Sequence, residues 1–216
     1  MAESKKRISR EERRIIIERQ LLAAAERLMA DGASFTELSV ERLAREAGIS
    51  RATFYIYFED KGHLLRQLTG QAFADFTDAA NNWWTVVDRH DPADTESSVR
   101  GIIAAFRDHQ HLMNAVGEMA SYTPGVADTL RTLMDSVIKE VESVIEAGKD
   151  AGIIRPDLPA HATATALSWM VERTCSQVIP GGDPHYDEDL ARAMTEIVWS
   201  TLYLTPLAGP KAVTDS

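Results

Sequence analysis

The chain has 216 residues, of which 44% are hydrophobic, so a sizeable core can be buried and a disordered composition is excluded. Cys175 is its single cysteine, which excludes an intrachain disulfide and fits a reducing, cytoplasmic setting. The net charge is −10, which at first argues against a nucleic-acid partner. We find no secretory signal and no apolar run of the roughly 20 residues that span a bilayer, and therefore expect no membrane association.

The charge is unevenly distributed along the chain. Residues 1–66 carry 13 basic and 11 acidic side chains, whereas the remaining residues carry 10 and 22. A weakly basic head on an acidic body can dock DNA phosphates with one face only. A solubilising N-terminal tail is an equally good interpretation of the charge alone.

Apolar residues recur at three- and four-residue spacing along almost the whole chain, which predicts an all-α fold of about nine helices. The predicted helices cover residues 11–30, 40–47, 51–57, 61–87, 95–110, 112–121, 125–151, 159–178 and 186–203. We expect a three-helix DNA-binding domain over residues 1–66 and an effector-binding and dimerisation domain over residues 67–205. Residues 206–216 are predicted to form a disordered tail.

The segment 39–58 has the pattern of a helix-turn-helix. Ser39 is a good N-cap for the second predicted helix, Gly48 can end it in the left-handed conformation, and Ser50 is a good N-cap for the third. Two short helices joined by so tight a turn are typical of DNA-reading units. The turn by itself is also compatible with a generic helical corner.

The third predicted helix has two chemically different faces. Phe54 and Phe58, spaced by four residues, are expected to face the core. The opposite face carries a cation, hydroxyls and a small side chain but no carboxylate, which suits contacts to bases and phosphates. Lys61, at the start of the fourth helix, is expected to hold a phosphate. The candidate DNA-binding residues are Ser39, Ser50, Arg51, Ala52, Thr53, Tyr55, Tyr57 and Lys61.

The run Gly-Ile-Ser-Arg-Ala-Thr-Phe-Tyr-Ile-Tyr-Phe over 48–58, followed by Lys61, resembles the signature of TetR-family repressors. Gly62 departs from the usual pattern, where a better helix former stands. The resemblance implies a nine-helix fold in which three N-terminal helices read DNA. It also implies that the remaining helices form an effector pocket and a dimer interface.

A second resemblance covers the C-terminal half. Leu-Pro-Ala-His over 158–161, Ala-Thr-Ala-Leu over 164–167, Met170 and Glu-Arg-Thr over 172–174 look like the EthR-type branch of the family, actinobacterial repressors with a long hydrophobic ligand channel. In that branch two asparagines on this helix bind the ligand. Ser168 and Val171 stand at the matching positions, so the resemblance implies a more apolar site.

Aromatic residues and methionines recur at helical spacing through the C-terminal half. Such residues are usually core, although Met and Trp also line adaptable apolar pockets, and the family resemblance favours a pocket. The candidate ligand-binding residues are Phe76, Trp83, Ile102, Phe106, Met113, Met119, Leu133, Met134, Val137, Ser168, Trp169 and Val171.

The last two long helices are candidates for a homodimer interface because small residues along them permit close helix approach. Packing within one subunit is the alternative. A dimer would place two reading helices about 34–36 Å apart, which matches successive half-sites of a palindrome. The expected partners are therefore palindromic double-stranded DNA, a small hydrophobic effector and a second copy of the chain.

Other possible sites are weak. His109 and His111 diverge on a helix, so a metal site beside Asp108 is not expected. Glu172 and Arg173 are interpreted as a structural ion pair, and Cys175 as an inert buried thiol. Because no catalytic constellation, P-loop or dinucleotide motif is found, we expect no enzyme and no cofactor. A repressor released by an effector is expected; an activator, a non-regulatory ligand-binding module and, least of all, an enzyme using the C-terminal cavity are the alternatives.

Overall fold

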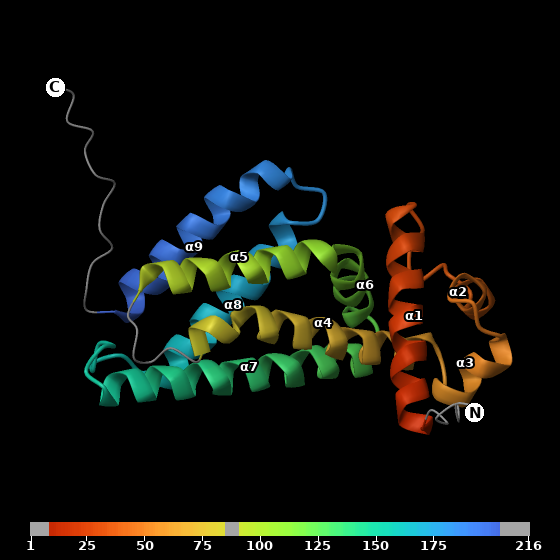
Figure 1. Cartoon of the computed structure of the whole chain (residues 1–216), viewed down its shortest axis with the longest axis horizontal. Helices are drawn as coiled ribbons and strands as arrows, with labels where there is room; N and C mark the ends of the chain where they lie inside the picture. Colours follow the sequence, from red (N-terminus) through yellow and green to blue (C-terminus); the bar gives the residue numbers. More distant parts are fainter. Residues whose placement is uncertain (1–8, 85–90, 204–216) are drawn as a thin grey trace, which may run out of the picture. The chain divides into compact units, whose positions relative to one another are not determined.

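The computed structural model of the chain describes residues 9–84 and 91–203, with the backbone alone for residues 81–84. Within these residues the chain forms nine α-helices and a short 3-10 turn, η1 (Pro184–Tyr186), so the predicted all-α fold is confirmed. The helices, labelled in Figure 1, are α1 (Arg10–Ala30), α2 (Val40–Glu46), α3 (Arg51–Tyr57), α4 (Lys61–Trp84), α5 (Pro92–Asp108), α6 (Gln110–Ala120), α7 (Pro124–Asp150), α8 (Ala160–Val178) and α9 (Asp187–Leu202). The predicted tail over 206–216 lies outside the described residues. None of the described helices is long and apolar enough to cross a membrane.

The chain divides into two compact units. Unit 1 contains the residues up to Gln71 together with His111–Leu130, and unit 2 contains Ala72–Gln110 together with the residues from Arg131 onward. The helices α4 and α7 each contain residues of both units. The sequence placed residues 111–130, and with them α6, in the C-terminal domain, whereas their contacts group them with the N-terminal helices.

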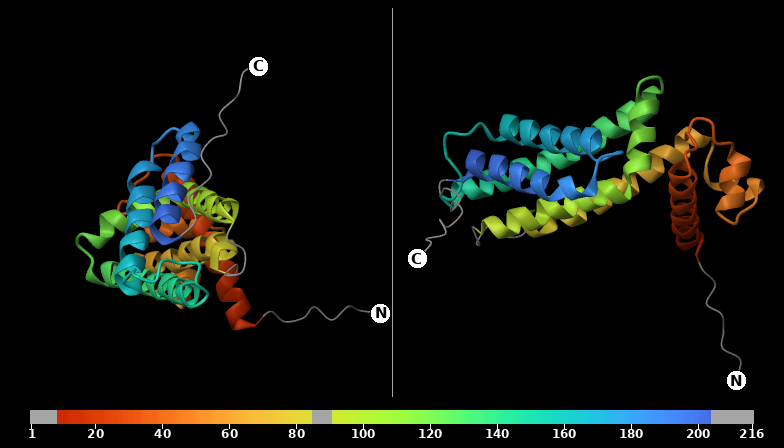
Figure 2. Two further views of the ribbon diagram at one scale, coloured as in Figure 1. Left: turned by 90° about the vertical axis from the view of Figure 1, so that its left-hand side faces the viewer. Right: turned by 90° about the horizontal axis from the view of Figure 1, so that it is seen from above.

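Unit 1 is built around the N-terminal helices. The helix α1 contacts α2, and α2 contacts α3, so the three pack in chain order. Figure 2 (right) shows α2 and α3 side by side in orange. Leu21, Leu43, Phe54 and Leu65 are fully buried and form part of its core.

The helix starts follow from local caps. Ser9 and Glu12 form a capping box: Ser9 Oγ accepts from the Glu12 amide at 3.1 Å, and the Glu12 carboxylate accepts from the Ser9 amide at 2.7 Å. The helix α5 begins at Pro92, three residues before its predicted start, because Asp91 accepts from the Ala93 amide at 2.9 Å and proline is favoured at the first helical position. Side-chain caps therefore explain why α1 and α5 both begin earlier than the apolar pattern indicated.

In unit 2, α5 packs against α8 and α9, and Figures 1 and 2 show these helices running along the unit together with α7. The loop between α8 and α9 is fixed by Arg107 of α5. Its guanidinium donates to the carbonyls of Ile179 at 2.8 Å and Gly182 at 3.0 Å, and to the carboxylate of Asp187 at 3.1 Å. One half-buried cation thus holds two segments of the chain that lie far from it in sequence.

Candidate DNA-reading helix and ligand cavity

The turn between α2 and α3 is stabilised as the sequence indicated. Ser39 Oγ accepts from the Arg42 amide at 3.1 Å, and Ser50 Oγ accepts from the Thr53 amide at 3.0 Å. Gly48 has φ +71°, a conformation that residues with a side chain rarely adopt. These local interactions end one helix and start the next within four residues.

The helix α3 presents a buried and an exposed face. The rings of Phe54 and Phe58 are buried, with their centroids 5.2 Å apart. On the opposite side Arg51, Tyr55 and Ile56 are exposed, and Ile56 is 63% exposed although the sequence analysis assigned it no role. An exposed branched apolar residue beside polar ones can pack against a thymine methyl group.

The other candidate reading residues lie at different depths. Ala52 is exposed, whereas Thr53 and Tyr57 are half-buried. The Thr53 hydroxyl lies 2.8 Å from Ser50 Oγ, so it belongs to the cap of the helix. Arg51 places its guanidinium 5.6 Å from the centre of the Tyr55 ring, one helical turn away. This contact orders a cation on the exposed face of a helix that contains no acidic residue.

Lys61 has a different environment from the one expected. Its ammonium donates to the carbonyls of Phe35, Thr36 and Leu38 at 3.2, 2.7 and 2.7 Å, and burial lowers its pKa. These three hydrogen bonds match the three protons of the ammonium. Lys61 therefore ties the start of α4 to the segment before α2, and we propose that it positions the helix-turn-helix rather than holding a phosphate itself.

Unit 2 contains a cavity of about 120 Å³. Its wall is formed by residues at helical spacing on α4, α5, α7 and α8, and by one residue of α9. Seven of the predicted ligand-binding residues line it: Phe76, Ile102, Phe106, Met134, Val137, Ser168 and Val171.

Five predicted ligand-binding residues are not among those that line the cavity. Met113 and Met119 are buried in unit 1, whereas every residue that forms the wall belongs to unit 2. Leu133 is half-buried beside the lining residue Met134, and Trp169 packs against the apolar cluster described below. The side chain of Trp83 lies outside the described residues.

Ten further residues line the cavity without having been selected from the sequence. They are Phe73, Thr77, Ala80, Thr95, Ser98, Val99, Val141, Leu167, Glu172 and Val198. Half of them are small or polar, and the search for aromatics and methionines passed over these. The spacing of Thr95, Ser98, Val99 and Ile102 on one face of α5 is the signal that could have found them.

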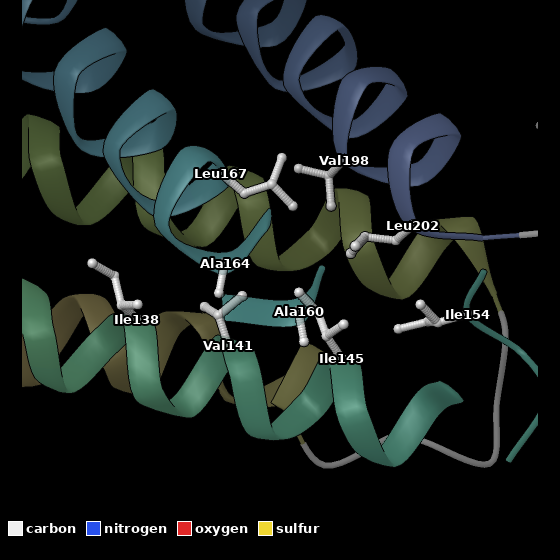
Figure 3. Close-up of a cluster of buried hydrophobic side chains, with 9 residues drawn as sticks. All are labelled: Ile138, Val141, Ile145, Ile154, Ala160, Ala164, Leu167, Val198 and Leu202. Atoms are coloured by element: carbon white, nitrogen blue, oxygen red, sulfur yellow. The ribbon is translucent and has the colours of Figure 1, made fainter. Parts of the chain in front are cut away.

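A cluster of buried aliphatic side chains adjoins the cavity. Figure 3 shows residues of α7, α8 and α9 pointing toward one another, with Ile154 beside them. Three of the cluster residues, Val141, Leu167 and Val198, also line the cavity. The cavity is therefore bordered on this side by well-packed core.

Three polar atoms on the cavity wall have no hydrogen-bond partner: Ser98 Oγ, Ser168 Oγ and Glu172 Oε2. Burial raises the pKa of Glu172, while the charge of Arg173 and the hydroxyl of Ser176 lower it. The nearest approach of Arg173 is 3.7 Å, from Nε to Oε2, and its side chain is exposed. The expected ion pair is thus present only as a contact beyond hydrogen-bond distance.

Cys175 lies fully buried on α8, three residues beyond Glu172. Burial raises the pKa of its thiol to about 12, with the negative charges of Glu172 and Asp187 adding to the effect. A thiol so rarely ionised reacts slowly, since the thiolate is the nucleophile.

His109 Nε2 lies 2.8 Å from a carboxylate oxygen of Asp75, and its ring meets Phe76 edge-on. Among the described residues no group of three or more possible ligands has the arrangement of a metal site.

A capped helix-turn-helix in one unit and a ligand-sized cavity between helices in the other define the class of one-component DNA-binding regulators. The sequence model of the bacterial regulatory proteins of the tetR family matches residues 21–68. The model of the C-terminal domain of the transcriptional regulator EthR matches residues 95–204.

The HTH-type transcriptional regulator EthR of Mycobacterium tuberculosis is 33% identical over 193 residues, which cover 84% of both chains. EthR of Mycolicibacterium smegmatis is 30% identical over 87% of both chains. The chain belongs to the TetR family of DNA-binding transcriptional regulators and has an EthR-type C-terminal domain. The family consists of regulators, which confirms that the protein is not an enzyme.

Solved structures show the same fold at lower identity. A TetR transcription regulator from Haloarcula marismortui superimposes with a TM-score of 0.69 at 19% identity, covering 89% of this chain and 99% of that one. The TetR family regulator PfmR from Thermus thermophilus gives a TM-score of 0.62 at 20% identity, covering 82% and 96%.

Proposed function

We propose that this regulator binds palindromic operator DNA as a homodimer and represses transcription until a small, largely apolar effector occupies the cavity of unit 2. The observation that carries the proposal is the exposed face of α3, where Arg51, Tyr55 and Ile56 stand on a helix without acidic residues. A cation, a phenol and an apolar side chain together can contact bases and phosphates.

The outer surfaces of α8 and α9 support the dimer. Ala162 and Ala166 of α8 are exposed, and Ile197 of α9 is 46% exposed. Small side chains permit close helix approach, and Ile197 adds apolar surface that a partner would bury. Other apolar residues of α9 are buried within the subunit and are not part of this surface: Ala191, Met194, Val198 and Leu202.

The proposed mechanism is a shift between two conformations, in which the effector favours the one that binds DNA less well. Helix α4 supports this coupling because it carries both Lys61, which anchors the segment before α2, and Phe76, which lines the cavity. A coupling free energy of about 1.4 kcal/mol would weaken DNA binding tenfold.

DNA binding is tested by fluorescence anisotropy with the intergenic DNA next to the gene, at two salt concentrations, against scrambled DNA of equal length. We expect tight binding that weakens with salt and is selective for the intergenic sequence. Arg51→Ala should weaken this binding about fivefold or more, since a base contact contributes about 1–3 kcal/mol. Arg192→Ala, which removes an exposed arginine of α9, is the matched control.

Tyr55→Ala should also weaken binding while the dimer stays intact in sedimentation. Unchanged affinity in both variants would contradict the assignment of α3 as the reading helix. Deleting the gene should raise transcription of the adjacent gene; a fall would favour an activator.

A further inference from the structure

The wall of the cavity contains three buried polar groups in an otherwise mostly apolar surface. Ser98, Ser168 and Glu172 are 3%, 7% and 6% exposed, and each has an oxygen without a hydrogen-bond partner. A buried polar atom left unpaired destabilises a protein by about 1–3 kcal/mol, and more when it is charged. Three such atoms on one wall leave acceptors that a bound molecule with several donors could satisfy.

The three groups belong to two helices that pack against each other. Ser168 and Glu172 are four residues apart on α8, so they lie on the same face, one turn from each other. Ser98 belongs to α5, which packs against α8. All three line the same cavity.

The charge on the wall has one sign. Among the described residues that line the cavity, Glu172 is the single ionisable one, and none is Lys, Arg or His. The nearby Arg173 lies beyond hydrogen-bond distance and is exposed to solvent, which screens its charge. A ligand carboxylate would therefore meet a like charge and no basic partner, whereas a ligand cation would meet an acceptor.

We propose that the effector is an amphiphilic primary amine, whose ammonium donates to Ser98 Oγ, Ser168 Oγ and Glu172 Oε2 and whose apolar chain lies along the aromatic part of the wall. The ammonium has three N–H donors for these three acceptors. Lys61 shows the same three-to-one arrangement in unit 1. Phe76 and Phe106, stacked at 4.2 Å between ring centres, provide the apolar surface. The inference rests on the proposed function, because it takes this cavity as the effector site.

The test compares ligands that share one tail. Octylamine, octanol, octanoate and octyltrimethylammonium are titrated into the full chain at pH 7.5 by isothermal titration calorimetry. Octylamine is expected to bind at least tenfold more tightly than octanol and octyltrimethylammonium, and octanoate the least tightly. Octanoate binding as well as octylamine, or no octylamine binding at 1 mM, would overturn the proposal. Equal binding of the trimethylated cation would overturn the three hydrogen bonds.

Substitutions of the wall residues test whether the preference for the amine depends on them. Glu172→Gln should weaken octylamine binding about tenfold while leaving octanol binding nearly unchanged, and Ser168→Ala should have a smaller effect in the same direction. Glu140→Gln, which removes an exposed carboxylate of α7, should change neither. An unchanged ratio of octylamine to octanol affinity in Glu172→Gln would contradict the proposal.

DNA binding separates this inference from the proposed function. If octylamine binds through Glu172 but leaves operator affinity unchanged, the ligand class stands and the effector mechanism is wrong. If operator DNA is bound and released by another ligand without any preference for amines, the regulatory function stands and the ligand class is wrong.

Discussion

The two units treat their buried polar groups in opposite ways. In unit 1 the Lys61 ammonium is satisfied by three carbonyls, and the caps at Ser39 and Ser50 are complete. In unit 2 the cavity wall leaves Ser168 and Glu172 each with an unpaired oxygen. Lys61 and the two capping serines thus have their partners within the chain, whereas the cavity wall has polar groups that a bound molecule could satisfy.

The difference indicates that the paired groups of unit 1 contribute to folding stability, whereas the unpaired groups of the cavity wall reduce it. A reading helix must present its side chains in a fixed geometry, so its supports are internally paired. A ligand site binds by supplying what the empty protein lacks, and that site lowers stability until it is filled. Removing the buried charge should therefore destabilise unit 1 at Lys61 and stabilise the ligand-free unit 2 at Glu172.

The largest expected effect is the loss of unfolding free energy when a buried phenylalanine is removed, and it should differ between the core of unit 1 and the cavity wall. Phe54→Ala should destabilise unit 1 by about 3–5 kcal/mol, because Phe54 is fully buried beneath the reading face. Phe76→Ala should cost at least about 1 kcal/mol less, since Phe76 borders the cavity and touches fewer atoms there. Guanidinium denaturation measures both, and equal losses would show that the cavity is packed as densely as the core.

Removing the Lys61 ammonium tests how much its three hydrogen bonds contribute to the stability of unit 1. Lys61→Met should destabilise unit 1 by about 2–3 kcal/mol, because three carbonyls lose a charged donor. Lys139→Met, at an exposed position of α7, should have little effect in the same urea titration. A loss below about 0.5 kcal/mol at Lys61 would mean that water replaces the ammonium without cost.

Removing the Glu172 charge should have the opposite sign. Burial raises the pKa of Glu172 above its ordinary value of 4.5, so the folded protein loses stability as the pH rises through the range between the unfolded and folded values. Glu172→Gln should abolish this loss and stabilise the ligand-free protein at pH 8 by about 1 kcal/mol.

Thermal melts at pH 8 and at pH 4.5 measure the effect of Glu172→Gln. The gain should shrink at the lower pH, because at its ordinary pKa of 4.5 the carboxyl is half protonated in the unfolded chain and more than half protonated in the folded protein. Glu140→Gln should show no such dependence, and a Glu172→Gln protein less stable than wild type at pH 8 would contradict the assignment.

The sequence predicted features that depend on neighbouring residues. Ser39, Gly48 and Ser50 mark the helix-turn-helix because caps and left-handed turns are local. The burial of Phe54 and Phe58 followed from helical periodicity in the same way. The start of α5 at Pro92 was missed because the helix was predicted from its apolar pattern, which does not include the capping Asp91 or Pro92.

Features that depend on distant segments could not be predicted. The three partners of Lys61 lie more than twenty residues before it, and nothing local places them around its side chain. Met113 and Met119 have the composition of pocket residues, but composition does not say which unit buries a helix face. The ion pair of Glu172 with its sequence neighbour Arg173 was predicted and is present at 3.7 Å, but the place of Glu172 on the cavity wall depends on helices distant in sequence.

The labelling rate of the single cysteine can measure local opening of α8. Because Cys175 is buried on the same helix as Ser168 and Glu172, a thiol reagent can reach it only while α8 is open. When reclosing is faster than labelling, the observed rate gives the equilibrium constant for that opening. A ligand held by α8 would slow the reaction in proportion to its occupancy, so labelling followed by mass spectrometry could rank ligands without DNA.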